Sequence, residues 1–81
     1  MDLVKLTEYL VKALVKNPEN VSVKQFESEE DEILIQVLVD SESMGPVIGK
    51  GGKMISSIRT IVNASSYINN NKKVRINIDS F

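Results

Sequence analysis

The stretch VIGKGGKMI, residues 47–55, contains three of the four glycines of this chain. Gly49 and Gly52 permit positive φ angles and a close approach to the backbone, so this stretch forms a turn and not a regular element. A helix that begins near Gly52 offers free N–H groups and the positive end of its dipole. Lys50 and Lys53 add charge at the same place. The stretch therefore predicts a binding site at which the backbone can hold anionic groups.

Two other glycine motifs that bind phosphates do not match. A P-loop requires a glycine five residues before Gly52 and a Ser or Thr after Lys53, but Val47 and Met54 stand there. A dinucleotide fingerprint requires a glycine where Met54 stands, and it follows a strand. The chain is also too short for either fold. A G-x-x-G turn can alternatively serve only as a tight connection between two helices.

The segments on either side of the glycine turn predict its setting. Residues 33–39 are apolar on both faces, which is typical of a strand in the middle of a sheet. After a break over residues 40–43, Ser43 is the expected cap of a helix over about 44–48. Pro46 then falls in the first turn of that helix, where its missing N–H costs nothing. A second helix, about 52–68, places Ile55, Ile58 and Val62 on one face.

The outer segments complete the expected order of elements. Residues 2–16 have the periodicity of an amphipathic helix that Asn17-Pro18 ends, and alternation predicts a strand over 21–26 and another over 74–79. Polar loops separate these segments at 27–32, an acidic hairpin, and at 69–73. The sequence predicts one α+β domain over residues 1–81, in the order α-β-β-α-α-β. Its three-stranded mixed sheet should have its last two strands parallel and three helices on one face.

Composition excludes several classes of function. The 81 residues contain no Cys and no His, which removes disulfides, thiolate and imidazole chemistry and the common metal ligands. We therefore predict that the protein is no enzyme and needs no metal or cofactor. With 42% hydrophobic and 26% charged residues, the chain is expected to fold as a soluble domain. No apolar run is long enough for a membrane span and no signal peptide is apparent, so we expect a cytoplasmic protein.

The net charge of −1 conceals a strong asymmetry along the chain. Residues 19–42 hold eight acids and one base, whereas residues 43–78 hold six bases and no acid. A basic half of one sign indicates an anionic partner. An uneven but merely solvated surface is the alternative.

Taken together, the Val-Ile-Gly-x-x-Gly-x-x-Ile pattern at 47–55 and the order of elements resemble a KH domain of the type II, bacterial arrangement. Over nearly its whole length the chain resembles the small single-KH RNA-binding proteins of bacteria, the KhpA type. The segments that carry this resemblance are 10–18, 44–53 and 58–62. It implies binding of single-stranded RNA, with the G-x-x-G loop clamping about four nucleotides of backbone.

The resemblance also implies roles for individual residues. The turn Gly49, Lys50, Gly51 and Gly52 would contact the sugar-phosphate backbone, and a further contact is expected at Lys53. The apolar positions that pack the two helices and floor the groove are Val47, Ile48 and Ile55. The resemblance also implies that Arg59 faces RNA, and helical spacing places Ser56, Arg59 and Asn63 on one stripe with Gly52. Of these three stripe residues, Ser56 and Arg59 are expected to bind RNA. The basic residues that either rim the groove or are merely solvated are Lys72, Lys73 and Arg75.

Some alternatives and departures concern single residues. Arg59 could form a structural salt bridge with an acid such as Asp40 instead of facing RNA. Pro46 stands where related proteins often carry a base, and Gly51 replaces a longer polar side chain, so weaker binding is expected. The four aromatic residues do not cluster in the sequence, which favours packing roles and disfavours a stacking platform; these are Tyr9, Phe26, Tyr67 and Phe81.

The resemblance implies a biological setting as well. Similar proteins are RNA chaperones or post-transcriptional regulators linked to cell elongation and division, and they pair with themselves or with a larger Jag-like KH-containing RNA-binding protein. The residues themselves indicate a dimer, because Met54, Ile61 and Ile68 exceed what a small core can cover. One rival hypothesis is a protein-interaction module that has lost nucleic-acid binding. Another is a factor that binds single-stranded DNA or associates with the ribosome.

Overall fold

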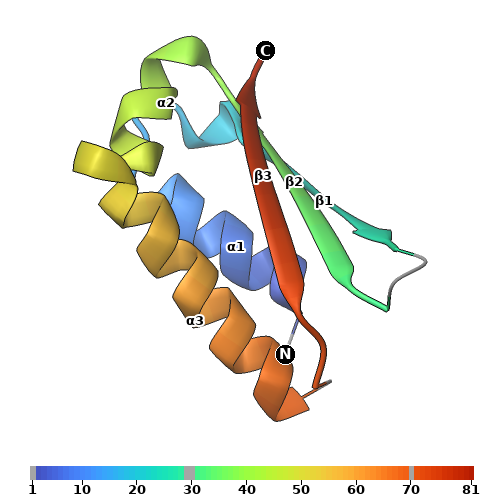
Figure 1. Cartoon of the computed structure of the whole chain (residues 1–81). Coiled ribbons are helices and arrows are strands. Elements are labelled where there is room, and N and C mark those ends of the chain that lie inside the picture. The colour runs from blue at the N-terminus through green and yellow to red at the C-terminus, as the bar shows by residue number, and fades with distance from the viewer. Residues whose placement is uncertain (1, 29–30, 70) are drawn as a thin grey trace.

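The computed structural model describes residues 2–28, 31–69 and 71–81, and it confirms the predicted α-β-β-α-α-β order (Figure 1). Residues 29–30 of the expected acidic hairpin and residue 70 of the expected polar loop lie outside the described residues. Short 3-10 turns occupy Pro18–Asn20 and Lys50–Gly52. The main elements are α1 (Leu3–Lys12), β1 (Ser22–Glu27), β2 (Ile33–Val39), α2 (Ser41–Ile48), α3 (Lys53–Asn69) and β3 (Val74–Ser80).

The sheet is mixed, as predicted. Its strand order is β1-β2-β3, with β1 antiparallel and β3 parallel to β2. The strand that is apolar on both faces, β2, therefore takes the central position. The three helices cover one face of the sheet (Figure 1). On the other face Leu34 and Leu38 are half-buried between neighbouring strands, because Leu34 lies between Phe26 and Arg75 in the register.

The core lies between the helical layer and the inner face of the sheet. The predicted apolar face of α3 is confirmed, because Ile55, Ile58 and Val62 are all buried. They pack in one cluster with buried residues of the other elements, which are Leu3, Val11, Ile33, Ile35, Val37, Val39, Val47, Val74 and Ile76. Burial of an aliphatic side chain contributes about 1.5–3 kcal/mol, so this cluster is the main source of stability.

Helix boundaries differ from the prediction in ways that have local causes. The first helix ends at Lys12 and not at residue 16, because the chain turns away before the constrained Asn17-Pro18 step. Its start is capped by the Asp2 carboxylate, which accepts from the N–H of Val4 at 2.9 Å. The third helix begins one residue later than expected and ends at Asn69.

The predicted cap of α2 is wrong. The helix begins at Ser41 with Asp40 at the N-cap position, so Pro46 lies in its interior and not in its first turn. Ser43 is buried within the helix, and its Oγ donates to Asp40 Oδ1 at 2.6 Å. The missing N–H of Pro46 leaves the carbonyl of Glu42, four residues earlier, without its helical donor. Both residues are exposed, so water can take the place of that donor.

Candidate functional site

The glycine turn connects α2 to α3 with backbone angles that side chains avoid. As predicted, Gly49 and Gly52 have positive φ values, of 77° and 79°, and Gly51 has one of 64° as well. At Gly49 the ψ angle is 173°, a combination that is essentially restricted to glycine. A Cβ atom built on Gly49 would lie 2.6 Å from the Cβ of Met54. The turn therefore packs its first glycine directly against the start of α3.

Charge and backbone donors meet at this turn. Lys50 and Lys53 are exposed, and neither forms an ion pair with any residue that the structure describes. Lys53 is the first residue of the 17-residue helix α3, whose first-turn N–H groups and positive dipole end are directed toward the same region. An anionic group can approach closely because Gly51 carries no side chain and is exposed. The turn thus provides two exposed cations, which form no ion pair within the described chain, beside the N-terminal end of α3.

The three apolar positions that were expected to floor a groove differ in exposure. Val47 is fully buried and Ile55 is 6% exposed, so both belong to the core and support the turn from beneath. Ile48 is half-buried, at the end of α2. Of the three, Ile48 has the side-chain surface that a ligand could contact.

Two adjoining hollows run along α3 below the turn. The first is lined by Ser56, Arg59, Thr60, Asn63, Ala64 and Tyr67. The second lies between α3 and β3 and is lined by Arg59, Asn63 and residues 73–77. The structure therefore brings together Ser56, Arg59 and Asn63 on one groove wall, as their spacing predicts. We refer to the two hollows as the α3–β3 groove.

Arg59 connects α3 to the edge of the sheet. Its Nη2 donates to the carbonyl oxygen of Ile76 at 3.1 Å. The alternative of a salt bridge with Asp40 is wrong, because the Asp40 carboxylate accepts from Ser43 Oγ and from Asn17 Nδ2. The hydrogen bond from Ser43, with a smaller contribution from Asn17, lowers the pKa of Asp40 against the opposing effect of desolvation.

Asn63 makes the other connection, and it was not among the residues expected to bind a ligand. The N–H of Val74 donates to Asn63 Oδ1 at 2.8 Å, and Asn63 Nδ2 donates to the carbonyl oxygen of Val74 at 3.0 Å. The side-chain amide thus pairs with Val74 as a neighbouring strand would. The helical stripe from Gly52 already contained Asn63, and that spacing was the available signal.

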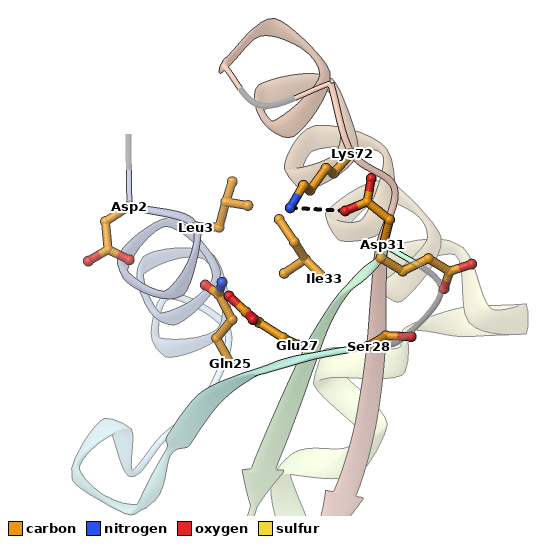
Figure 2. A pocket seen from close by; sticks show the side chains of 9 residues that line it. Asp2, Leu3, Gln25, Glu27, Ser28, Asp31, Ile33 and Lys72 are labelled. Atoms are coloured by element: carbon orange, nitrogen blue, oxygen red, sulfur yellow. Dashed lines mark ion pairs between the residues drawn. The ribbon is translucent and has the colours of Figure 1, made fainter.

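The basic residues near the start of β3 are mostly paired with acids. Lys72 forms an ion pair with Asp31, drawn as a dashed line in Figure 2, in which Nζ lies 3.2 Å from Oδ1. Arg75 Nε lies 3.8 Å from Glu32 Oε2. Lys73 is exposed and forms no ion pair with the described residues. The hollow beside Lys72 is lined largely by acidic and amide groups, which include Asp2, Gln25, Glu27 and Asp31 (Figure 2). This region is therefore distinct in charge from the glycine turn.

Exposed apolar side chains lie on a different flank of α3. Met54, Ile61 and Ile68 are 39%, 46% and 83% exposed. They recur every seven residues and therefore form one stripe, which we call the apolar flank, on the side of α3 away from Ser56, Arg59 and Asn63. The four aromatic residues are all exposed, and none belongs to the core.

Metal binding and membrane insertion find no support in the described part of the chain. Within those ranges, no group of three or more His, Cys, Asp or Glu residues is arranged to hold a metal ion. Nor do residues 2–28, 31–69 and 71–81 include a helix with the length and apolar character needed to cross a membrane.

Comparisons with known proteins cover nearly the whole chain. The family model described as KhpA/KhpB, KH domain, matches residues 4–78. The RNA-binding protein KhpA of Clostridium perfringens is 44% identical over 73 residues, which are 90% of this chain and 95% of that protein. The RNA-binding protein KhpA of Thermotoga maritima is 33% identical over 73 residues, or 90% of this chain and 93% of that protein.

Solved structures agree with the fold. Era, crystallised in complex with MgGDPNP and nucleotides 1506–1542 of 16S ribosomal RNA, superposes with a TM-score of 0.65 over 96% of this chain at 17% identity. This chain spans 29% of that Era chain. Aquifex aeolicus Era bound to GDP.AlF4- gives a TM-score of 0.64, also at 17% identity. At this level of identity the likeness concerns the arrangement of helices and strands, which is that of a type II KH fold.

Proposed function

Because the chain belongs to the KhpA/KhpB KH-domain family, we propose that it binds single-stranded RNA without catalysing a reaction, as one KH domain over residues 1–81. The observation that carries the proposal is the glycine turn, where α3 begins and where Lys50 and Lys53 form no ion pair with the described residues. The phosphates of RNA are regularly spaced along its backbone. Backbone N–H groups of a protein with adjacent cations bind such phosphates without recognising the base sequence. We expect the RNA to continue from the turn along α3 to the α3–β3 groove, where its bases would lie.

The groove provides a second set of contacts. An arginine has five N–H donors, and Arg59 uses one of them on Ile76, so the others remain for a phosphate or a base edge. In the groove Ser56 offers a hydroxyl, and next to the turn Ile48 offers an aliphatic surface to a base. With no aromatic residue on the groove except Tyr67 at its margin, stacking contributes little. Few phosphate contacts, roughly 2–4, imply a shallow salt slope of about −0.7 for each.

The test is fluorescence anisotropy with short labelled single-stranded RNAs across a salt series. The variant is Lys50→Asp with Gly51→Asp, and its matched control is Lys5→Asp with Asn20→Asp, which changes the net charge by the same amount at exposed positions elsewhere. We expect wild type and control to bind and the turn variant to lose at least about tenfold in affinity. Circular dichroism verifies that all three fold.

The other outcomes are equally informative. If the turn variant binds like the control, the turn is not the clamp. If wild type binds no RNA but forms a specific complex with another protein, the chain is an interaction module. Equal affinity for a single-stranded DNA of the same sequence would show that the protein does not recognise the 2′-hydroxyl.

We also propose that the protein self-associates through the apolar flank. One small domain makes few RNA contacts. In a dimer, an RNA bound to one copy meets the second copy at a high effective concentration, so overall affinity rises without any new contact. Ile61 lies in the middle of the flank and is half-exposed. We expect Ile61→Asp to yield monomers in sedimentation experiments at concentrations where wild type is dimeric, with affinity for a four-nucleotide RNA unchanged. A wild type that is monomeric at all concentrations contradicts the proposal.

The cellular role follows from the family resemblance and is likewise proposed. It is that of an RNA chaperone or post-transcriptional regulator linked to cell elongation and division, acting in the cytoplasm. The same flank is available to a larger KH-containing, Jag-like partner in place of a second copy. Ile61→Asp would then reduce capture of that partner as well as self-association.

A further inference from the structure

The strand β3 has a free edge that faces α3. The N–H of Ile33 donates to the carbonyl oxygen of Lys73 at 2.9 Å, and the N–H of Phe81 donates to the carbonyl oxygen of Val39 at 3.1 Å. Backbone groups of odd-numbered residues in this strand are therefore directed toward β2. Successive residues alternate in direction along a strand, so Val74, Ile76, Ile78 and Ser80 direct their N–H and C=O groups toward the free edge.

Side chains already occupy part of this edge. Asn63 takes both the N–H and the C=O of Val74, and Arg59 takes the C=O of Ile76. The N–H of Ser80 donates to Asp79 Oδ1 at 2.8 Å. Among the described residues, the N–H of Ile76 and both groups of Ile78 have no such partner. The open part of the edge therefore lies toward the glycine turn, and the closed part lies at Val74.

A second, independent feature distinguishes the same end of the groove. Two of the three cations near Val74, Lys72 and Arg75, are paired with Asp31 and Glu32, whereas Lys73 forms no ion pair with the described residues. Glu27 lies in the same acidic region (Figure 2). A phosphate that continued to Lys72 or Arg75 would have to displace a carboxylate from its cation and would meet the repulsion of the other acids. Hydrogen bonding and charge thus oppose RNA at one place.

We propose that Asn63, together with Asp31 and Glu32, forms an end stop that limits the length of RNA in the groove. RNA enters at the glycine turn, follows the edge of β3 past Ile78 and Ile76, and does not continue past Val74 toward Lys72. The proposal rests on the proposed RNA binding and specifies how far the RNA extends along the groove. Asn63 acts here as a positioning residue, because it blocks backbone groups that a base would otherwise contact.

The measurement is affinity as a function of RNA length, from three to eight nucleotides, at several salt concentrations. For wild type we expect affinity to rise with RNA length up to about four nucleotides and then to level off. Any further increase should reflect only the larger number of positions at which a longer RNA can bind. Two variants remove the stop: Asn63→Ala frees the edge at Val74, and Asp31→Asn with Glu32→Gln frees Lys72 and Arg75. The control is Glu8→Gln with Glu19→Gln, which removes the same charge from α1 and the following turn.

Combining Asn63→Ala with the loop variant should increase the RNA length at which affinity levels off by at least one nucleotide. It should also steepen the salt slope by about 0.7 for each additional phosphate that the protein binds, which a purely structural role of Asn63 does not do. The loop variant alone should steepen the slope, so it carries the test if Asn63→Ala unfolds in thermal melts.

Each result is decisive. If wild type binds RNA and neither the plateau nor the slope differs from the control in any folded variant, the end stop is wrong while the proposed function stands. If the slope steepens equally in the control, the effect is net charge and the end stop is also wrong. If wild type binds none of the RNAs, the proposed function fails and the end stop fails with it.

Discussion

Lysines lie near both ends of α3, but the two ends differ in whether lysines and backbone groups already have partners within the described chain. At the N-terminal end, glycines with positive φ leave the backbone accessible, and Lys50 and Lys53 are unpaired within the described chain. At the C-terminal end, Ser66 Oγ donates to the carbonyl oxygen of Lys72 at 2.7 Å, and the Lys72 side chain is paired with Asp31. The number of lysines is therefore a poor guide to a binding surface. What matters is whether cations and backbone groups are already satisfied.

The difference has a simple physical origin. At the first end, the glycines leave the backbone of the turn without side chains that could cover it. Along the rest of the helix, Arg59, Asn63 and Ser66 contribute polar atoms that satisfy the backbone of the neighbouring strand and loop. One end of the helix is thus available to an external ligand, and the other end holds the sheet in place.

The largest expected effect is on stability at the accessible end, from Gly49→Ala. This substitution puts a side chain where φ is 77° and ψ is 173°, and its Cβ would lie 2.6 Å from the Cβ of Met54. We expect a loss on the order of 2–4 kcal/mol in the free energy of unfolding, from strain and overpacking together. In a domain of this size, that loss lowers Tm by at least about 10 °C.

Gly51→Ala is the matched control for this prediction. Gly51 also has a positive φ, but nothing lies within 4 Å of an added Cβ, and its angles fall in the left-handed helical region. We expect it to cost only about 1 kcal/mol. Thermal melts of the two variants separate the close contact at Gly49 from backbone preference alone, and equal losses would contradict the contact with Met54.

A smaller effect is expected at the opposite end of α3, from Ser66→Ala. The hydroxyl is fully buried and donates to the carbonyl oxygen of Lys72. Its removal leaves that carbonyl without this donor, which costs about 1–2 kcal/mol. Ser57→Ala is the control, because Ser57 is exposed and its hydroxyl only donates to Lys53 within the same helix. Its free energy of unfolding, measured by urea titration, should stay within about 0.5 kcal/mol of the wild-type value. A Ser66→Ala variant as stable as Ser57→Ala would show that this end is less tightly held than the hydrogen bond suggests.

Much of the fold could be predicted because its signals are local. Strand β2 is apolar at nearly every position and matches its predicted range of 33–39, and the apolar period of α3 locates its buried face. The start of α2 could not be placed, because Asp40, Ser41 and Ser43 are all suitable caps. The choice of Asp40 depends on a buried Ser43 hydroxyl that bonds back to it, and burial is a tertiary property.

The candidate site was predictable only in part, for the same reason. The glycine turn is contiguous in sequence, so its geometry could be inferred. The partners of Lys72 and Arg75 lie about 40 residues away, in a loop that parallel pairing of β2 with β3 brings beside them. Reading 43–78 as a uniformly basic half therefore overestimated the charge available there. Arg59 was expected to face either RNA or an acid, and a backbone carbonyl of an edge strand was not considered.

The smallest effect tests the comparison of the two ends directly, because it removes one lysine from each. Lys50→Ala and Lys72→Ala change the net charge equally, so long-range electrostatics are matched. If availability decides binding, Lys50→Ala should weaken RNA binding about fivefold, or about 1 kcal/mol, and make the salt slope shallower by about 0.7. Lys72→Ala should change affinity less than twofold, because its charge is already opposed by Asp31. Anisotropy titrations at two or more salt concentrations measure both quantities, and equal losses from the two variants would mean that charge alone, wherever it lies, holds the RNA.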